Sequence, residues 1–255
     1  MVIALSPMVA PIFGGKIADL WGWKSCFFIM ALVAATIWFA TVICLKESLS
    51  PENRTENKIR FSARLLLDTY GQLLKRREIV TYSLISAITL GGLWAWIVEA
   101  PFYMINQLGI KSVDYGYYAA LGPGAYILGT FLNRKGVIFY GVERMLAFGL
   151  WLMILGAGLT FIASIYFPLS LTALYIPFSI YSIGLAPVFA NAVTKAMAVI
   201  PSQRGGASAL LNSLEMGISS LCAFAVSFLS NGTLIPCTLM MLGSGIICAL
   251  MFSST

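Results

Sequence analysis

Histidine is absent from this sequence of 255 residues. Its absence excludes imidazole metal sites and catalytic triads that depend on histidine. The sequence also lacks a glycine-rich loop followed by Lys-Ser or Lys-Thr, so no ATP-binding motif is evident. Five cysteines lie in apolar runs without the spacing of metal ligands, and we expect them to be small core residues: Cys26, Cys44, Cys222, Cys237 and Cys248. We therefore expect no metal, no cofactor and no enzymatic activity.

Charge is also scarce, at 10% of the residues, whereas hydrophobic residues make up 59%. Soluble domains average about 25% charged and about 45 to 50% apolar residues. The composition therefore predicts an all-α, polytopic membrane protein with the lipid bilayer as its surroundings. The formal net charge of +6 does not indicate a nucleic-acid partner, because the basic residues lie in segments between hydrophobic runs and form no continuous basic face.

One long polar stretch, from Lys46 to Arg77, interrupts the hydrophobic runs. It holds half of the 16 lysine and arginine residues, and such clusters stay on the cytoplasmic side during membrane insertion. Within it, apolar residues recur near helical spacing between Ile59 and Leu74, which predicts an amphipathic helix on the cytoplasmic membrane surface. An ordinary solvated linker is the alternative.

The hydrophobic runs on both sides have lengths near the ~20 residues of a membrane span. Before the polar stretch, Val2 to Phe13 is too short to span a bilayer, Gly15 to Trp23 predicts a polar turn, and Lys24 to Leu45 predicts a full span. After it, six spans are predicted, at residues 79–102, 115–133, 145–166, 169–193, 207–229 and 234–252. Asn231-Gly232 should form the tight turn between the last two spans.

The distribution of basic residues orients these spans. Alternation from a cytoplasmic Arg77 leaves only Lys16, Lys24 and Lys111 outside, and the other thirteen of the 16 basic residues inside. This asymmetry predicts that the central stretch and the C-terminus are both cytoplasmic.

Glu215 is one of two carboxylates within the predicted spans. A charge at bilayer depth is costly, so it usually faces a cavity or a partner. One face of its helix carries further polar side chains at intervals of three or four residues: Ser208, Asn212, Ser219 and Cys222. Leu210, Leu214 and Leu221 are expected on the other side. The stripe favours a translocation path in which Glu215 attracts a cationic drug or takes up a proton, and an interhelical hydrogen bond that only packs the bundle is the alternative.

Glu99 is the second carboxylate, near the predicted outer end of its helix. Trp96 and Tyr103 lie on or near the same face, and aromatic rings beside a carboxylate suit a lipophilic cation. Trp and Tyr also populate membrane interfaces for amphipathic reasons alone, and that reading stays open.

A short motif near the start resembles a known family. Ala10-Pro11-Ile12-Phe13-Gly14-Gly15 resembles the antiporter motif in the fifth helix of drug:proton antiporters of the major facilitator superfamily, although the family has Gly where Ala10 stands. Pro11 cannot donate a helix hydrogen bond, and the pair Gly14 and Gly15 allows close backbone contact, so we expect a kinked helix packed tightly on a neighbour.

Three further segments resemble the same superfamily. The stretch from Gly129 to Gly136 is similar to its cytoplasmic loop between helices eight and nine, with Asn133 in place of the usual Asp. The matching residues there are Gly129, Asn133, Arg134, Gly136 and Arg144. Ala100-Pro101-Phe102-Tyr103 and the stretch 206–211 resemble the Bcr/CflA subfamily of bicyclomycin and multidrug resistance transporters.

The resemblance implies how the chain is organised. Residues 1–45 would be the end of an N-terminal bundle, with part of helix five and all of helix six. Residues 46–78 would be the cytoplasmic central loop with its amphipathic helix, and residues 79–255 a C-terminal six-helix bundle. In this family the acidic residues and the arginine tied to proton coupling lie mainly in helices one to four, so their roles cannot be assigned to residues of this chain.

The function implied by the resemblance is multidrug efflux across the inner membrane by a secondary active drug:proton antiporter. Its partners would be a small lipophilic or cationic substrate, protons as the coupling ion, and a separately encoded N-terminal half, because the chain corresponds to an incomplete or split transporter. The alternatives are an inactive remnant and a non-transporting polytopic membrane protein, such as a receptor or assembly factor.

Overall fold

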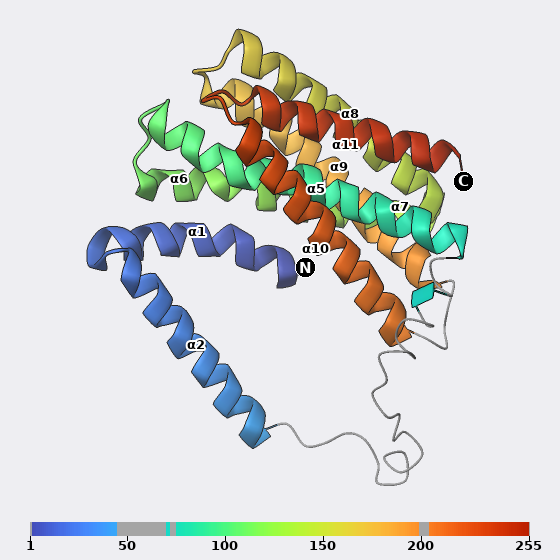
Figure 1. Cartoon of the computed structure of the whole chain (residues 1–255), viewed down its shortest axis with the longest axis horizontal. Coiled ribbons are helices and arrows are strands. Elements are labelled where there is room, and N and C mark those ends of the chain that lie inside the picture. Colours follow the sequence, from blue (N-terminus) through green and yellow to red (C-terminus); the bar gives the residue numbers. More distant parts are fainter. Residues whose placement is uncertain (1, 45–69, 72–74, 199–203, 255) are drawn as a thin grey trace.

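The computed structural model describes residues 2–44, 70–71, 75–198 and 204–254. The elements within these ranges are all helices, which confirms the all-α fold: α1 (Val2–Trp21), α2 (Trp23–Cys44), α5 (Arg77–Asn106), α6 (Ser112–Ala119), α7 (Leu121–Tyr140), α8 (Val142–Tyr166), α9 (Leu171–Ala198), α10 (Arg204–Leu229) and α11 (Ile235–Ser253). Figure 1 shows α5 to α11 gathered in one bundle, with α1 beside it and α2 leading away.

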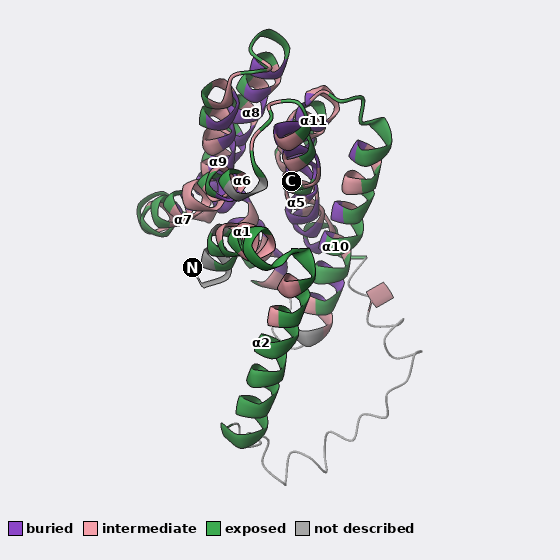
Figure 2. Ribbon diagram, turned by 90° about the vertical axis from the view of Figure 1, so that its left-hand side faces the viewer, coloured by how far each residue is buried: buried purple, intermediate pink, exposed green. Residues whose placement is uncertain are grey.

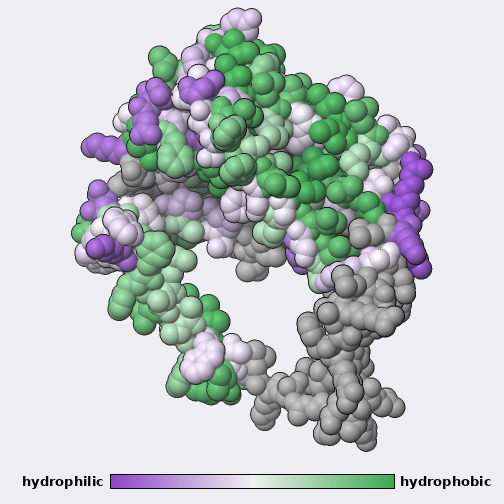
Figure 3. All heavy atoms as spheres, in the orientation of Figure 1, coloured by the Kyte–Doolittle hydropathy of each residue, from purple (hydrophilic) through white to green (hydrophobic). Residues whose placement is uncertain are grey.

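The surface of the bundle has the pattern of a membrane protein. Six of the described helices are long and apolar enough to cross a bilayer, namely α2, α5, α8, α9, α11 and the part of α10 from Gly206 to Leu229. Figure 3 shows hydrophobic side chains over most of the visible bundle, with hydrophilic side chains gathered toward its two ends. The chain is therefore a multi-pass membrane protein.

The centre of the bundle is built on α5 and α9. The buried core includes Ala95, Met104, Leu174 and Tyr181 from these two helices. By contrast, α2 has no buried residue, and Figure 2 shows it exposed over most of its length, with partly buried residues only near its start. A helix that is apolar all round and touches little protein is suited to contact with lipid.

Glycines bring the backbones of α8 and α9 into direct contact. A Cβ atom on Gly149 would lie 2.8 Å from the carbonyl oxygen of Gly184, and one on Gly156 would lie 2.8 Å from that of Pro177. No side chain separates the two helices at these points, and small residues of this kind are typical of close helix contacts in membranes. We call this contact the glycine seam.

The first predicted turn is wrong. Gly15 to Trp23 was expected to be a polar turn after a short run, but α1 is helical without interruption to Trp21. The chain reverses at Gly22, which has a φ of 79° that favours glycine. The helix continues because its backbone groups are satisfied within the helix whether or not its side chains are polar.

The predicted span at residues 115–133 is not one continuous helix. Two helices replace it, α6 and α7, which meet at Ala120, and neither is among the described helices that are long and apolar enough to cross a bilayer. The segment from Gly129 to Gly136, expected to be a loop, lies inside α7. The connection between α7 and α8 is the single residue Gly141, which has a φ of 82°. The other predicted spans match described helices to within about five residues at each end.

Three further expectations have different outcomes. The turn at Asn231-Gly232 is confirmed, since Gly232 has a φ of 78° and the side-chain oxygen of Asn231 accepts a hydrogen bond from the backbone of Thr233. The predicted amphipathic helix from Ile59 to Leu74 lies outside the described residues, apart from Tyr70 and Gly71. Cys237 and Cys248 are buried as expected, but Cys44 is exposed, so the core expectation is wrong for Cys44.

Candidate functional site

Glu215 lies in the contact between α10 and α5. Only 3% of its surface is exposed, and Ser86 of α5, which is fully buried, faces its carboxyl group. Among the described residues, no hydrogen-bond partner is present for its Oε1 atom or for the hydroxyl of Ser219, one turn further along α10. A buried carboxylate with an unsatisfied oxygen is costly at this depth, so the site is suited to take up a proton or another small partner.

The two helices also approach closely two turns beyond Glu215. A Cβ atom on Gly91 of α5 would lie 2.8 Å from the sulfur of Cys222. The polar face predicted for Glu215, Ser219 and Cys222 is therefore brought together against α5. The nearby hydroxyl of Ser86 is occupied by its own helix, where it donates to the carbonyl oxygen of Ser83.

The rest of the predicted stripe is arranged differently. Asn212 is exposed and its amide donates to the backbone oxygen of Ser208, 3.0 Å away, so it bonds to its own helix. Leu210 and Leu214, expected on the opposite side from Glu215, pack with Ile79 at the start of α5. The predicted separation of a polar face from these two leucines is therefore wrong, whereas Leu221 is exposed as expected.

Glu99 is buried and has a partner. Its carboxylate accepts a hydrogen bond from the hydroxyl of Ser230, which follows α10. Tyr103 donates its hydroxyl to the carbonyl oxygen of Pro168, 2.8 Å away, at the turn between α8 and α9. Both side chains therefore connect helices at the same end of the bundle.

Trp96 belongs to an aromatic cluster that the sequence analysis missed. Its ring stacks on Phe178 of α9 with 4.2 Å between centroids and meets Tyr175 edge-on at 5.8 Å. Tyr118 of α6 and Tyr181 of α9 extend the cluster. The hydroxyl of Tyr175 is buried without a hydrogen-bond partner among the described residues. Aromatic residues at intervals of three in α9 were the available signal.

The antiporter-like motif packs against α6. A Cβ atom on Gly116 of α6 would lie 2.7 Å from the carbonyl oxygen of Pro11. The close approach thus depends on a glycine of the partner helix. At Gly14 itself no atom lies within 4 Å of a Cβ position, so the expectation of a close contact there is wrong.

Asn133 joins α7 to α9. Its amide and that of Asn191 exchange hydrogen bonds, with lengths of 3.3 and 2.9 Å, and both residues are buried. Gly129 packs on the backbone oxygen of Ile183, and Gly136 packs on Met145. The predicted loop residues therefore hold helices together. Arg134 and Arg144 are exposed at this end of the bundle, where Lys195 forms a salt bridge with Glu143.

No group of three or more Cys, Asp or Glu side chains that could hold a metal ion is found within the described ranges. The arrangement is therefore a helix bundle with one incompletely satisfied carboxylate and one aromatic cluster at its centre.

Comparison with known proteins shows the family of this chain. The sequence model of the Major Facilitator Superfamily matches residues 1–223. The chain belongs to this superfamily. It is therefore a member of a family of transporters and not of enzymes.

The relatives of this major facilitator chain include drug resistance proteins. It is 26% identical over 237 residues to the bicyclomycin resistance protein homolog of Haemophilus influenzae, a match that covers 92% of this chain and 58% of that protein. It is 24% identical over 222 residues to the multidrug transporter MdfA of Edwardsiella piscicida, covering 86% of this chain and 52% of that protein. The resemblance to Bcr/CflA transporters is thereby confirmed, and the chain spans little more than half of these relatives.

The fold is also similar to that of a solved structure. The bacterial homologue of the iron transporter ferroportin, in its inward-facing state, matches 98% of this chain and 60% of its own chain. The TM-score is 0.62 at 16% sequence identity. This likeness concerns the fold alone.

Proposed function

We propose that the chain forms part of a drug:proton antiporter that exports small lipophilic or cationic drugs across a bacterial inner membrane. Support comes from the relatives, one named for bicyclomycin resistance and another for multidrug transport. The chain spans 58% and 52% of these two proteins, and we propose that it forms the transporter together with a bundle that corresponds to the rest of these relatives. Transport would follow alternating access of two bundles around a midplane cavity.

Orientation is part of the proposal. Residues 46–78 and the C-terminus would lie in the cytoplasm, and residues 79–255 would form the C-terminal bundle. The support is the distribution of lysine and arginine, thirteen of 16 of which this orientation places inside.

The single observation that carries the proton coupling is the buried carboxyl group of Glu215 with its unpaired oxygen. A group in this position is sealed from water while α10 packs on α5, and it exchanges protons with water when that contact opens. A cationic drug reaching the opened site would compete with the proton for the carboxylate. Glu99, tied to Ser230, and Trp96, within the aromatic cluster, would shape the outer part of the path.

Proton release on ligand binding tests this assignment. The purified chain is titrated with tetraphenylphosphonium, a lipophilic cation, and released protons are measured with a pH-sensitive dye. We expect release from the native chain and little from Glu215→Gln, which keeps the shape of the side chain and most of its hydrogen bonds. Glu143→Gln is the matched control, because Glu143 is exposed and paired with Lys195 away from the proposed path, and it should release protons as the native chain does.

Two outcomes would contradict the proposal. Unchanged binding and proton release in Glu215→Gln, together with a destabilised Glu215→Leu, would make Glu215 a structural tie between α5 and α10. No binding of the cation by the correctly folded chain, either alone or together with the other bundle, would favour an inactive or non-transporting membrane protein.

A further inference from the structure

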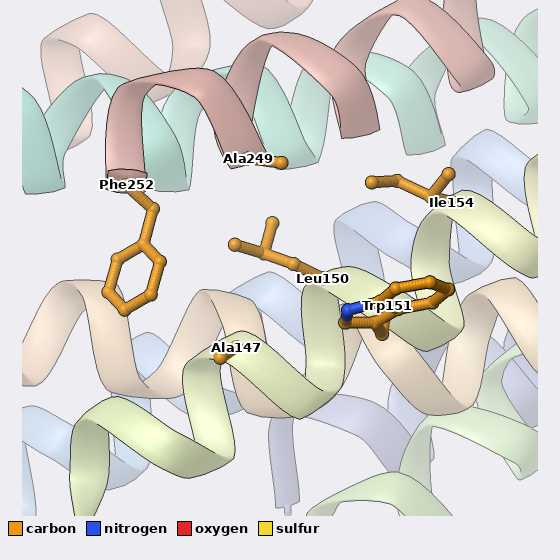
Figure 4. Close-up of a pocket in the computed structure, with 6 residues that line it drawn as sticks. All are labelled: Ala147, Leu150, Trp151, Ile154, Ala249 and Phe252. Atoms are coloured by element: carbon orange, nitrogen blue, oxygen red, sulfur yellow. The ribbon is translucent and has the colours of Figure 1, made fainter. Parts of the chain in front are cut away.

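An apolar groove lies on the outside of the bundle between α8 and α11. Ala147, Leu150, Trp151 and Ile154 of α8 line it together with Ala249 and Phe252 of α11. Its volume is about 230 Å³, and Figure 4 shows the six side chains around the space between the two helices. For comparison, an apolar cavity of ~150 Å³ accommodates benzene. The groove therefore has room for a stretch of hydrocarbon chain.

The shape of the groove follows from the residues that line it. Ala147 and Ala249 have the smallest side chains in the set and leave the gap, while Leu150, almost fully buried, closes its base. Trp151 is 76% exposed, so its ring is available to whatever fills the groove. Ala147 and Ile154 are seven residues apart, which gives the groove a length of ~10 Å along α8.

Positive charge flanks one end of the groove. Arg144 is exposed one turn before Ala147 and two turns before Trp151, on the same face of α8. The guanidinium of Arg77 donates to the carbonyl oxygen of Ser254, 3.0 Å away and two residues beyond Phe252. Within the described parts of the chain, the salt bridge at this end joins Lys195 to Glu143, and neither arginine forms one.

We propose that this groove binds one anionic phospholipid, with an acyl chain against Trp151 and Ala249 and the phosphate held by Arg144 and Arg77. Charge complementarity selects this occupant over a neutral lipid, because guanidinium groups bind phosphate oxygens through paired hydrogen bonds. Arg77 has five N–H donors and uses one on Ser254, so others remain for the phosphate. The site is independent of the proposed transport function.

Native mass spectrometry of the purified chain tests the site. The chain is titrated with phosphatidylglycerol and, separately, with phosphatidylcholine of the same acyl chains. We expect one phosphatidylglycerol to be retained well below the concentration at which phosphatidylcholine binds. Arg144→Gln should weaken this binding roughly tenfold, since it removes a charge-assisted hydrogen bond, and Ala147→Phe should abolish it by filling the groove. Lys135→Gln, which removes an exposed cation of α7 outside the groove lining, should have no effect.

Equal retention of the two lipids, or retention that neither groove variant changes, would show only surrounding lipid and overturn the proposal. A dimer of the chain that Ala147→Phe dissociates would instead assign the groove to a second copy. If Ala147→Phe fails to fold, quenching of tryptophan fluorescence by lipids brominated on the acyl chain decides. Brominated phosphatidylglycerol should then reduce the tryptophan fluorescence of the native chain more than that of Trp151→Phe. If brominated phosphatidylcholine gives the same difference between the two chains, the proposed site is overturned.

Discussion

At the scale of single residues, Asn133 offers the sharpest stability test. Its amide and that of Asn191 satisfy each other inside the bundle, so Asn133→Leu leaves Asn191 buried without a partner. Interhelical hydrogen bonds in membranes contribute about 0.6 kcal/mol on average, and an abandoned partner adds to the loss. We expect Asn133→Leu to destabilise the chain by about 1 to 2 kcal/mol, measured as a lower midpoint in thermal unfolding in detergent.

The double variant Asn133→Leu with Asn191→Leu is the control. Replacing both partners leaves no unpaired amide, so it should be more stable than either single variant. A double variant whose loss equals the sum of the two single losses would show that the two amides do not interact.

How far individual residues could be predicted from the sequence depended on their chemistry. The burial of Glu215 and Glu99 against protein followed from the cost of charge in lipid. The side of α10 on which Leu210 and Leu214 lie did not follow, because lipid and protein core are equally apolar and leucine suits both. The exposure of Asn212 also did not follow, because its short side chain bonds to the preceding turn of its own helix and needs no polar partner elsewhere.

At the scale of helices, the contact between α1 and α6 depends on one position. Gly116→Ala would place a Cβ atom 2.7 Å from the backbone oxygen of Pro11, which cannot move away as a side chain can. We expect this variant to lower the thermal unfolding midpoint. Gly124→Ala in α7 is the matched control, since no atom lies within 4 Å of its Cβ position.

The control should be neutral or stabilising, because alanine in a helix is favoured over glycine by roughly 0.5 to 1 kcal/mol. Equal midpoints for the two variants would mean that α1 and α6 do not pack through Gly116.

The ends of helices were harder to predict than their existence. Long apolar runs indicated most spans, but polar residues do not end a helix in a membrane. The helix α1 passes through Lys16 and Asp19 and stops at Gly22, and α7 passes through Arg134 and Lys135 and stops at Gly141. In both cases a glycine with positive φ ends the helix, while long basic side chains extend their charges toward water.

At the scale of the whole molecule, the orientation can be tested by labelling. A single cysteine from Asn57→Cys, on a background without the five native cysteines, should react with an impermeant maleimide only after cells are permeabilised. Lys111→Cys, between α5 and α6, should react in intact cells and serves as the control. Reaction of the cysteine at position 57 in intact cells would mean that the predicted alternation of spans is wrong.

Drug efflux tests the need for a partner bundle. We expect residues 1–255, expressed in a strain without its own drug pumps, to export no ethidium, because one bundle cannot form a cavity with two walls. Fluorescent dye retention measures this, with a complete drug antiporter as the positive control. Proton-dependent export by the purified chain in liposomes would show that it needs no partner.

The glycine seam determines which parts of the bundle can move. Because α8 and α9 touch through their backbones at Gly149, Gly156 and Gly184, sliding either helix along the other would drive Cβ atoms of neighbouring residues into carbonyl oxygens. The two helices therefore move as one rigid unit, with a fixed position of one helix along the other. In the proposed transport cycle we therefore expect shape change elsewhere, for example at the contact of α10 with α5. A cross-link that fixes α8 to α9 should therefore leave the proposed cycle intact, whereas one that fixes α10 to α5 should stop it.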